Sequence, residues 1–528
     1  MELSLKGFKD LLPAEMLARD RMVAVIKEVF ESYGFVPIAT PALEYKRVLL
    51  AYSEATAELT RDEFDHLLVE FPAARTTLQP VLREEGGLVF IPLSALSIQQ
   101  QNELGVSCLE RIVGRAMADK QIYLFQEPDG SAVGLRFDLT VPMSRFVADH
   151  PELPRPFKRY QFQPVWRYDK PDPGRFREFA QFDIDTVGTD SLMADAEIIA
   201  AMHESLDKLG LNYRIRYSSR KVLNSLLTYA NIPADRAHAL FRIIDKLEKQ
   251  GLENIKKELG PGRIDASGDP IPGLHLDTEQ IGRIVQFLTI GEAGRVKTLN
   301  ALKRLFAEVE GAGEGIGELE EIHHYLDAME IADHRVIIDP TIARGLDYYT
   351  GPIFEAVLID EKLGNFGSVM GGGRYDHLIG KFLGEEIPAT GASIGVDRLL
   401  SALQKIGGAP GRPSTAEVLV TVMDRERIIE YQKIARELRA AGFNTELYIG
   451  REKSLGKQLK YADLQMIPVA VIAGSDEFAA GQVSIKDLRA MRSEQNEIKE
   501  RSEWVKKKVG QVTVGRDQMV DEIRALLA

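Results

Sequence analysis

Apolar positions recur with two periods along the first part of the chain, and these periods predict its elements. Residues 13–34 repeat apolar side chains at helical spacing and end at a glycine, which predicts an amphipathic helix. The next ten residues, FVPIATPALE, predict a strand with a proline-marked turn. Residues 121–146 predict two strands around an Asp-Gly turn and then a helix, and residues 159–187 predict a second hairpin.

Helical spacing dominates the middle of the chain. It covers 192–209 and much of 220–330, where LFRIIDKLEKQGLENIKKEL is the clearest stretch. Strand patterns return at 353–359 and 366–370, and a helix begins near Gly395. Residues 54–115 show no motif, and the sequence assigns them no role.

The segment IGGAPGRPST, at 406–415, is a predicted linker because it is rich in Gly and Pro. Strands and helices alternate after it, which predicts a separate βαβ-type domain at 416–528. The first domain then spans 1–405 and contains the helical segment 220–330.

Composition narrows the class of protein. A chain of 528 residues, 45% hydrophobic and 27% charged, is long enough for two or three globular domains. The single Cys108 excludes an internal disulfide and a cysteine metal cage, and it fits a reducing cytoplasm. We find no apolar run of membrane-spanning length and expect no membrane partner. The net charge of −13 neither supports nor excludes a nucleic-acid partner.

One candidate for chemistry is WRYDKPDPGRFREFAQFDID, at 166–185. Three arginines flank its Pro/Gly turn, so their guanidinium groups are expected to converge on one face, where they suit phosphate. These arginines are Arg167, Arg175 and Arg177. Strand alternation places a further set on one common side: Phe179, Gln181, Asp183 and Asp185. The alternative is a solvated, salt-bridged hairpin.

Three further segments are weaker signals when taken singly. ARGLDYYTG, 343–351, offers Arg344 and two tyrosines for a polar ligand, or else a strand edge with half-buried tyrosines. GGGRYD, 371–376, lets backbone pass close to a neighbour. Arg398 lies in a predicted helix, where the default is a surface salt bridge.

In this combination and order, the segments resemble class II aminoacyl-tRNA synthetases, and within that class the histidyl-tRNA synthetase family. GFVPIATPALE with Pro41 resembles the first class motif, the Arg167 hairpin the second, and GASIGVDRLL with Arg398 the third. ARGLDYYTG and GGGRYD resemble the two signatures of the histidyl enzymes. No Ser/His/Asp or metal-ligand cluster is expected, because adenylate formation needs positioning and charge stabilisation more than proton transfer.

The resemblance implies an α+β fold, with an antiparallel sheet surrounded by helices, a helical insertion and a C-terminal mixed α/β anticodon-binding domain. It implies that L-histidine is activated with ATP to histidyl-adenylate and transferred to the 3′ end of tRNA(His). Mg²⁺ is expected with ATP. A cytoplasmic homodimer is expected, with the first motif at the subunit interface.

The resemblance also carries residue roles. For ATP it implies Arg167, Asp169, Arg175, Phe179, Arg344 and Arg398. For histidine it implies Asp138, Thr140, Gln181, Asp185, Tyr348 and Tyr349. Among these, Arg167, Arg344 and Arg398 would be catalytic, Phe179 would stack on adenine, and Asp185 with Tyr349 would bind the imidazole. In the last domain a phosphate-facing patch is expected from Arg451, Lys453, Lys457 and Lys460.

Departures from the family pattern leave alternatives open. Asp138 and Asp185 stand where many bacterial members have Glu, and KPDP departs from the bacterial turn, which leaves recognition of the tRNA 5′ end undetermined. One alternative is a non-catalytic paralogue that regulates histidine biosynthesis; the retained arginines and the complete last domain argue against it. A class II synthetase for another amino acid and a pure RNA-binding module are the others.

Overall fold

A computed structural model of the chain divides into two compact units, Met22–Gly408 with Met1–Lys9, and Ala409–Ala528 with Asp10–Arg21. The residues that it describes are 5–50, 56–85, 88–92, 122–168, 170, 174–265, 268–290, 294–343, 348–364, 366–407, 411–489 and 510–528, with single positions between 96 and 112. None of the helices in these ranges is long and apolar enough to span a bilayer.

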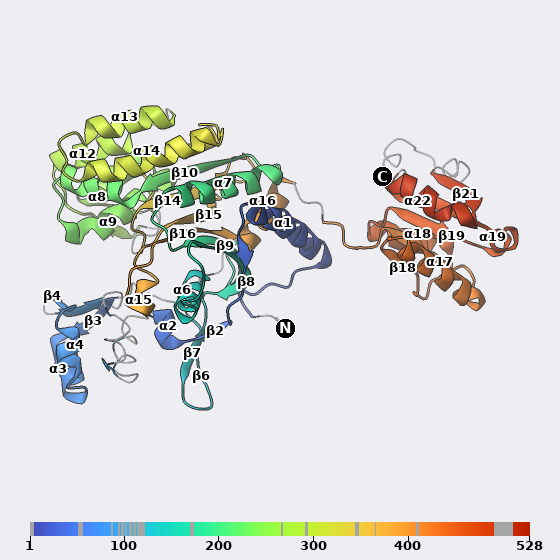
Figure 1. The fold of residues 1–528 in the computed structure, drawn as a ribbon, viewed down its shortest axis with the longest axis horizontal. Coiled ribbons are helices and arrows are strands. Elements are labelled where there is room, and N and C mark those ends of the chain that lie inside the picture. The colour runs from blue at the N-terminus through green and yellow to red at the C-terminus, as the bar shows by residue number, and fades with distance from the viewer. Residues whose placement is uncertain are drawn as a thin grey trace. The chain divides into compact units, whose positions relative to one another are not determined.

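The first unit is built on an eight-stranded sheet (Figure 1). In order across the sheet its strands are β1 (Val36–Pro37), β8 (Phe157–Trp166), β9 (Glu178–Val187), β16 (Ala389–Gly395), β15 (Ser368–Arg374), β14 (Pro352–Leu358), β10 (Tyr213–Ser219) and β13 (Val336–Ile338). The inner pairs are antiparallel, and only the pairs at the two edges, β1–β8 and β10–β13, are parallel. The expected α+β class with a largely antiparallel sheet is confirmed.

The two faces of β9 differ in chemistry because its side chains alternate. Phe182 and Ile184 point to the apolar side, where Phe182 meets Phe30 of α1 (Pro13–Ser32) with ring centroids 4.9 Å apart. The opposite side carries polar residues. Helices α7 (Met193–Lys208) and α16 (Val396–Ile406) also contact this sheet. The predicted helices at 13–34, 192–209 and near Gly395 are therefore confirmed.

A small sheet begins within the segment that resembles the first motif of class II synthetases. Its antiparallel strands are β2 (Leu43–Tyr45), β7 (Ala132–Leu135) and β6 (Leu124–Gln126), and the predicted helix follows as α6 (Thr140–Asp149). Buried Arg136 joins this region to the main sheet. Its guanidinium donates to the carbonyls of Thr40 at 2.7 Å and Pro164 at 2.9 Å.

The segment between β10 and β13 is helical, as predicted. It comprises α8 (Arg220–Tyr229), α9 (Ala237–Ile244), α10 (Leu247–Gln250), α11 (Leu252–Leu259), α12 (Thr278–Leu288), α13 (Arg295–Leu305) and α14 (Ala312–Ala328), with a hairpin of β11 (Gly262–Ile264) and β12 (Pro270–Pro272). The stretch 240–259, however, is not one continuous helix. Gly251, at φ +75°, separates α10 from α11, a backbone conformation that favours glycine.

Residues 56–112, which the sequence left unplaced, contain a small substructure. It has β3 (Thr56–Thr60), α3 (Arg61–Glu70), α4 (Ala74–Leu78), β4 (Arg83–Glu85) and β5 (Leu88–Pro92), with sheet order β3-β5-β4. Side chains such as Phe64, Leu78 and Ile91 form an apolar cluster of its own.

The second unit is a five-stranded mixed sheet with helices. Its elements are β17 (Val418–Val420), α17 (Ile428–Ala440), β18 (Thr445–Leu447), α18 (Leu455–Leu464), β19 (Val469–Ile472), α19 (Ser475–Ala480), β20 (Gln482–Asp487), β21 (Gln511–Gly515) and α22 (Met519–Leu527). Strands β18, β17 and β19 are parallel, which confirms the expected βαβ rhythm. The antiparallel β21 and the closing helix α22 were not predicted.

Candidate active site

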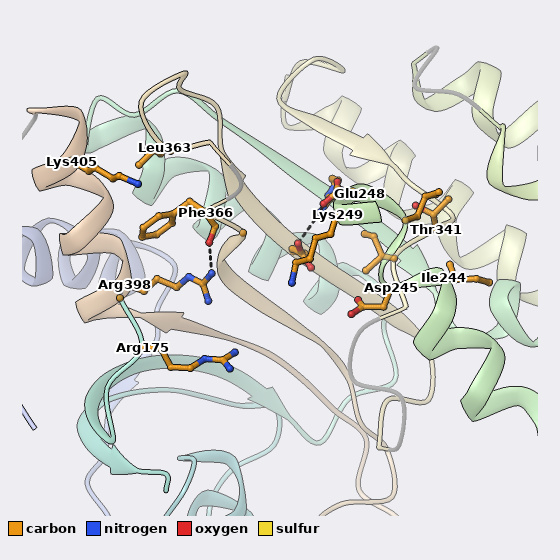
Figure 2. A pocket seen from close by; sticks show the side chains of 16 residues that line it. Arg175, Ile244, Asp245, Glu248, Lys249, Thr341, Leu363, Phe366, Arg398 and Lys405 are labelled. Carbon is orange, nitrogen blue, oxygen red and sulfur yellow. Dashed lines mark hydrogen bonds and ion pairs between the residues drawn. The ribbon is translucent and has the colours of Figure 1, made fainter. Parts of the chain in front are cut away.

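Two cavities lie over the polar face of the main sheet. The larger has a volume of about 860 Å³ and the smaller about 460 Å³. Residues that line both are Gly174, Arg175, Asp245, Lys249 and Arg398, so the two cavities adjoin. Figure 2 shows the smaller one.

Glycines in the sheet make the floor of the larger cavity a trough. Strand register places Gln181, Asp183 and Asp185 of β9 opposite Gly395, Ser393 and Gly391 of β16. The next strand continues these rows with Gly371 and Gly373. A Cβ atom on Gly391 would lie 1.9 Å from Oδ1 of Asp185, so only glycine fits there. Asp185 fills the space over Gly391, whereas Gly371 and Gly395 line the larger cavity beside Gln181 and Ser393.

Three arginines from separate elements reach the cavities. Arg167 follows β8, donates from Nε to the carbonyl of Phe137 at 2.8 Å, and lies 5.2 Å from the ring centre of Phe179. Arg175 comes from the hairpin turn. Arg398 lies in the first turn of α16 and donates to the carbonyl of Phe366. Guanidinium groups that surround a cavity suit a polyphosphate.

The N-terminus of α16 is tied to β9, which sets the position of Arg398. The neighbouring Asp397 accepts a hydrogen bond from the backbone N–H of Ala180 at 2.6 Å. A helix that begins beside a cavity also directs its positive end there, which favours phosphate oxygens.

The helical insertion contributes residues that the sequence reasoning missed. Arg242, Asp245, Lys246 and Lys249 line the larger cavity. Figure 2 shows Lys249 and Asp245 across the smaller cavity from Arg175 and Arg398. Their spacing of three, one and three residues predicts one polar helical face, although the structure places Arg242 in α9, Lys249 in α10, and Asp245 and Lys246 in the turn between the two helices. That polar face was a signal that the sequence offered.

A charged cluster closes one end of the smaller cavity. Arg216 of β10 contacts Glu355 of β14 at 2.8 Å, Asp339 at 3.4 Å, and Glu248 of α10. Because Glu248 belongs to the insertion and Glu355 to the sheet, Arg216 holds these two parts of the first unit together.

Two buried acids lie along the floor beside Gln181. Asp185 forms an ion pair with Arg159 at 2.6 Å and accepts a hydrogen bond from Tyr375. Burial raises the pKa of Asp185, and Arg159 and Tyr375 offset part of that effect. Burial raises the pKa of Asp183 to about 7, while Arg159 acts in the opposite direction.

Comparison with known proteins decides the family. The family model "Histidyl-tRNA synthetase" matches residues 106–399, and "Anticodon binding domain" matches 417–508. The histidine–tRNA ligase of Ruegeria pomeroyi is 44% identical, and the match covers 99% of this chain and 96% of that protein. This chain belongs to the histidyl-tRNA synthetase family.

Further relatives of the same family agree. The histidine–tRNA ligase of Caulobacter vibrioides is 43% identical over 77% of this chain and 84% of its own length. The crystal structure of histidyl-tRNA synthetase from Nostoc sp. PCC 7120 has a TM-score of 0.72 and 31% identity, with 99% of both chains covered. Matches of this extent, with an anticodon-binding domain, support an aminoacyl-tRNA ligase and exclude the regulatory paralogue and the pure RNA-binding module.

The structure gathers most of the residues that the histidyl-tRNA synthetase signatures indicate. Those that line the larger cavity are Arg167, Arg175, Phe179, Gln181, Tyr348, Tyr349 and Arg398. Asp138 and Thr140 are not among its lining residues; they lie at the start of α6, where Asp138 accepts from the N–H of Val141 at 3.1 Å. Arg344 and Asp169 lie outside the described residues.

One expectation about the hairpin arginines needs correction. Arg177 does not join Arg167 and Arg175 at the cavity, because its guanidinium lies 3.8 Å from the ring centre of Tyr168 and donates to the carbonyl of Lys6. In GGGRYD, Arg374 is structural: it pairs with buried Asp195 of α7. The described part of the chain has no group of three or more His, Cys, Asp or Glu side chains suited to a metal.

Proposed function

We propose that the larger cavity binds ATP and L-histidine together, forms histidyl-adenylate, and passes histidine to the 3′ end of tRNA(His). The observation that carries this proposal is the meeting of Arg167, Arg175 and Arg398 over a polar, glycine-floored trough. Attack by the histidine carboxylate on the α-phosphate places charge on phosphate oxygens, and fixed guanidinium groups stabilise that charge.

Each end of the cavity has a role in this proposal. Arg167, with Arg344 from the histidyl signature, holds the α-phosphate, while Arg175 and Arg398 hold the outer phosphates and then the pyrophosphate. Phe179 provides a flat apolar face for adenine, and the guanidinium of Arg167 lies 5.2 Å from the centre of that ring. Gln181, Tyr348 and Tyr349 lie on the histidine side, with Asp138 and Thr140 toward the amino group.

Magnesium, in this proposal, arrives as the counter-ion of ATP. Of the acidic residues that line the cavities, Asp397 accepts from the backbone, and Glu248 and Glu355 bind Arg216, which leaves the carboxylate of Asp245. A single carboxylate does not fit a resident metal site, and no step is assigned to a protein-held ion.

The test is ATP–pyrophosphate exchange with each of the twenty amino acids and no tRNA. We expect exchange with histidine only. Arg175→Ala is expected to lower kcat/KM for ATP by about 100-fold, since charged hydrogen bonds to the phosphates are lost. Arg177→Ala is the matched control, two residues away on the same hairpin, and should change exchange less than about threefold. Equal losses in both variants, or exchange with another amino acid, would contradict the proposal.

The remaining parts of the proposal concern assembly and RNA. The second unit binds the anticodon arm, with exposed Arg451, Lys453 and Lys460 available to phosphates. The first unit forms a homodimer, supported by exposed apolar side chains on β1, β2 and β6, among them Val36 and Tyr45. The cytoplasmic location stays a prediction.

A further inference from the structure

Arg216 of β10 is held in place by two acids from the neighbouring strands. The residue is buried, and its Nη2 donates to Oε1 of Glu355 on β14 at 2.8 Å. Its Nη1 donates to Oδ2 of Asp339, directly after β13, at 3.4 Å. Asp339 is fixed in turn, because its Oδ1 accepts from the N–H of Thr341 at 3.0 Å and from its hydroxyl at 2.7 Å. The sheet side of the smaller cavity therefore presents a guanidinium group with a defined position.

Glu248 is a third acid on this guanidinium, and it comes from the helical insertion. The contact has two points: Glu248 Oε1 accepts from Nη1 of Arg216, and Oε2 accepts from Nη2 at 3.3 Å. The Glu248 side chain is 66% exposed, so burial does not hold it there. A planar guanidinium that binds both oxygens sets the orientation of a carboxylate as well as its place.

Helix α10, which carries Glu248, is too short to fix its own orientation. It is a single turn of four residues, none of them buried, and Gly251 ends it at φ +75°. One helical turn is unstable alone, because its nucleation costs more than its hydrogen bonds return. Lys246, directly before α10, pairs with Glu258 of α11 at 2.9 Å, which ties the turn to the insertion. The Glu248–Arg216 pair ties it to the sheet.

Lys249 is the residue whose direction this ion pair sets. Consecutive side chains of a helix point about 100° apart, so a Glu248 directed at Arg216 turns Lys249 to another side. Both residues line the smaller cavity, but of the two only Lys249 also lines the larger one. Arg175 and Arg398, to which we assign the outer phosphates, line both cavities as well, and Figure 2 shows Lys249 across from them.

We propose that Glu248 is a positioning residue for ATP: its ion pair with Arg216 orients α10 so that the ammonium group of Lys249 faces the outer phosphates. Glu248 touches no substrate and acts through Lys249. This inference rests on the proposed function. It concerns only the contribution of the insertion to the ATP site, and its failure leaves adenylate formation by the three arginines intact.

Glu248→Gln provides a test in which charge and positioning predict opposite signs. Removal of a negative charge near the phosphates would by itself lower the KM for ATP. Because the ion pair that orients Lys249 is lost, we expect instead that the KM for ATP in pyrophosphate exchange rises about 3- to 5-fold. The kcat and the KM for histidine should not change, since the lost contact is to ATP alone.

Two further variants bracket this result. Glu248→Asp keeps the charge, and its KM for ATP should lie between those of wild type and Glu248→Gln. Glu253→Gln is the matched control on α11, where Glu253 is 79% exposed and pairs with Lys256 at 2.7 Å. It should behave like wild type, and melting curves verify that each variant is folded.

A double-mutant cycle tests whether Glu248 acts through Lys249. Lys249→Ala alone should raise the KM for ATP about fivefold, and addition of Glu248→Gln should not raise it further. The inference is overturned if the KM for ATP falls or stays unchanged in Glu248→Gln, or if the two effects multiply in the double variant. Wild-type protein without histidine-dependent exchange would instead refute the proposed function itself.

Discussion

A carboxyl group buried without a full set of partners stores unfavourable free energy in the folded protein. Asp183 is in this position, with Arg159 as the nearby cation and Asp185 and Asp138 as nearby acids. Its pKa in the fold is about 7, above its usual value of 3.8, so the folded state binds a proton more tightly than the unfolded state does. As pH rises from about 4 to about 7, this difference lowers stability, and the loss is complete above pH 7.

Asp183→Asn should therefore stabilise the folded protein. We expect a gain of roughly 2 to 4 kcal/mol at pH 8, because one pKa unit corresponds to about 1.4 kcal/mol. The gain should stay constant from pH 8 to about pH 7 and shrink as pH falls from about 7 to about 4. Urea unfolding of both proteins across that range measures it, and a gain independent of pH would show that ionisation of Asp183 is not its cause.

At the scale of single elements, the arrangement of side chains was best predicted in the hairpin that resembles the second motif of class II synthetases. Alternation in REFAQFDID put Gln181, Asp183 and Asp185 on one face, and the structure has them in that arrangement. What alternation cannot give is the partner of each acid. That depends on Arg159, Tyr375 and Ser393, which reach β9 from other strands and from a stretch about 200 residues later.

The insertion helices show a second limit of the sequence pattern. Helical periodicity at 240–259 gave the correct element type but not the break at Gly251, because periodicity reports which side chains are buried and not whether the axis is continuous. Helical periodicity also does not show which residues the polar face of the insertion contacts. The sequence predicts that Lys249 is a polar residue of a helix. That it lines the same cavity as Arg175 and Arg398 follows only from the packing of the insertion.

A substitution of Lys249 tests whether the polar face of the insertion contributes to the proposed ATP site. It lines both cavities, so Lys249→Glu places a negative charge near the proposed phosphate site and should raise the KM for ATP about tenfold. The KM for histidine should change little. Lys257→Glu, on the exposed side of α11, is the charge-matched control and should behave like wild type. Steady-state exchange at varied ATP measures both, and equal KM values for the two variants would remove the insertion from the ATP site.

At the scale of the whole molecule, exposed apolar side chains predict self-association. Val36, Leu43, Tyr45 and Phe125 on β1, β2 and β6 are each roughly half exposed. We expect light scattering in solution to give twice the 58.9 kDa of one chain. Phe125→Asp should shift the protein toward monomer. Val69→Asp, at a residue 78% exposed on α3, should not, and a wild-type monomer at micromolar concentration would contradict the dimer.

The strand order of the main sheet has a consequence for synthesis of the protein. Strand β9 ends at Val187, but its neighbour β16 ends at Gly395. At about 5 to 20 residues per second, the ribosome needs roughly 10 to 40 s to reach the second strand after it has made the first. During that interval one edge of β9, with its acids, has no partner strand. The floor of the larger cavity is thus among the last parts of the first unit to form, and a nascent chain stalled before Gly395 would expose a strand edge prone to misassociation.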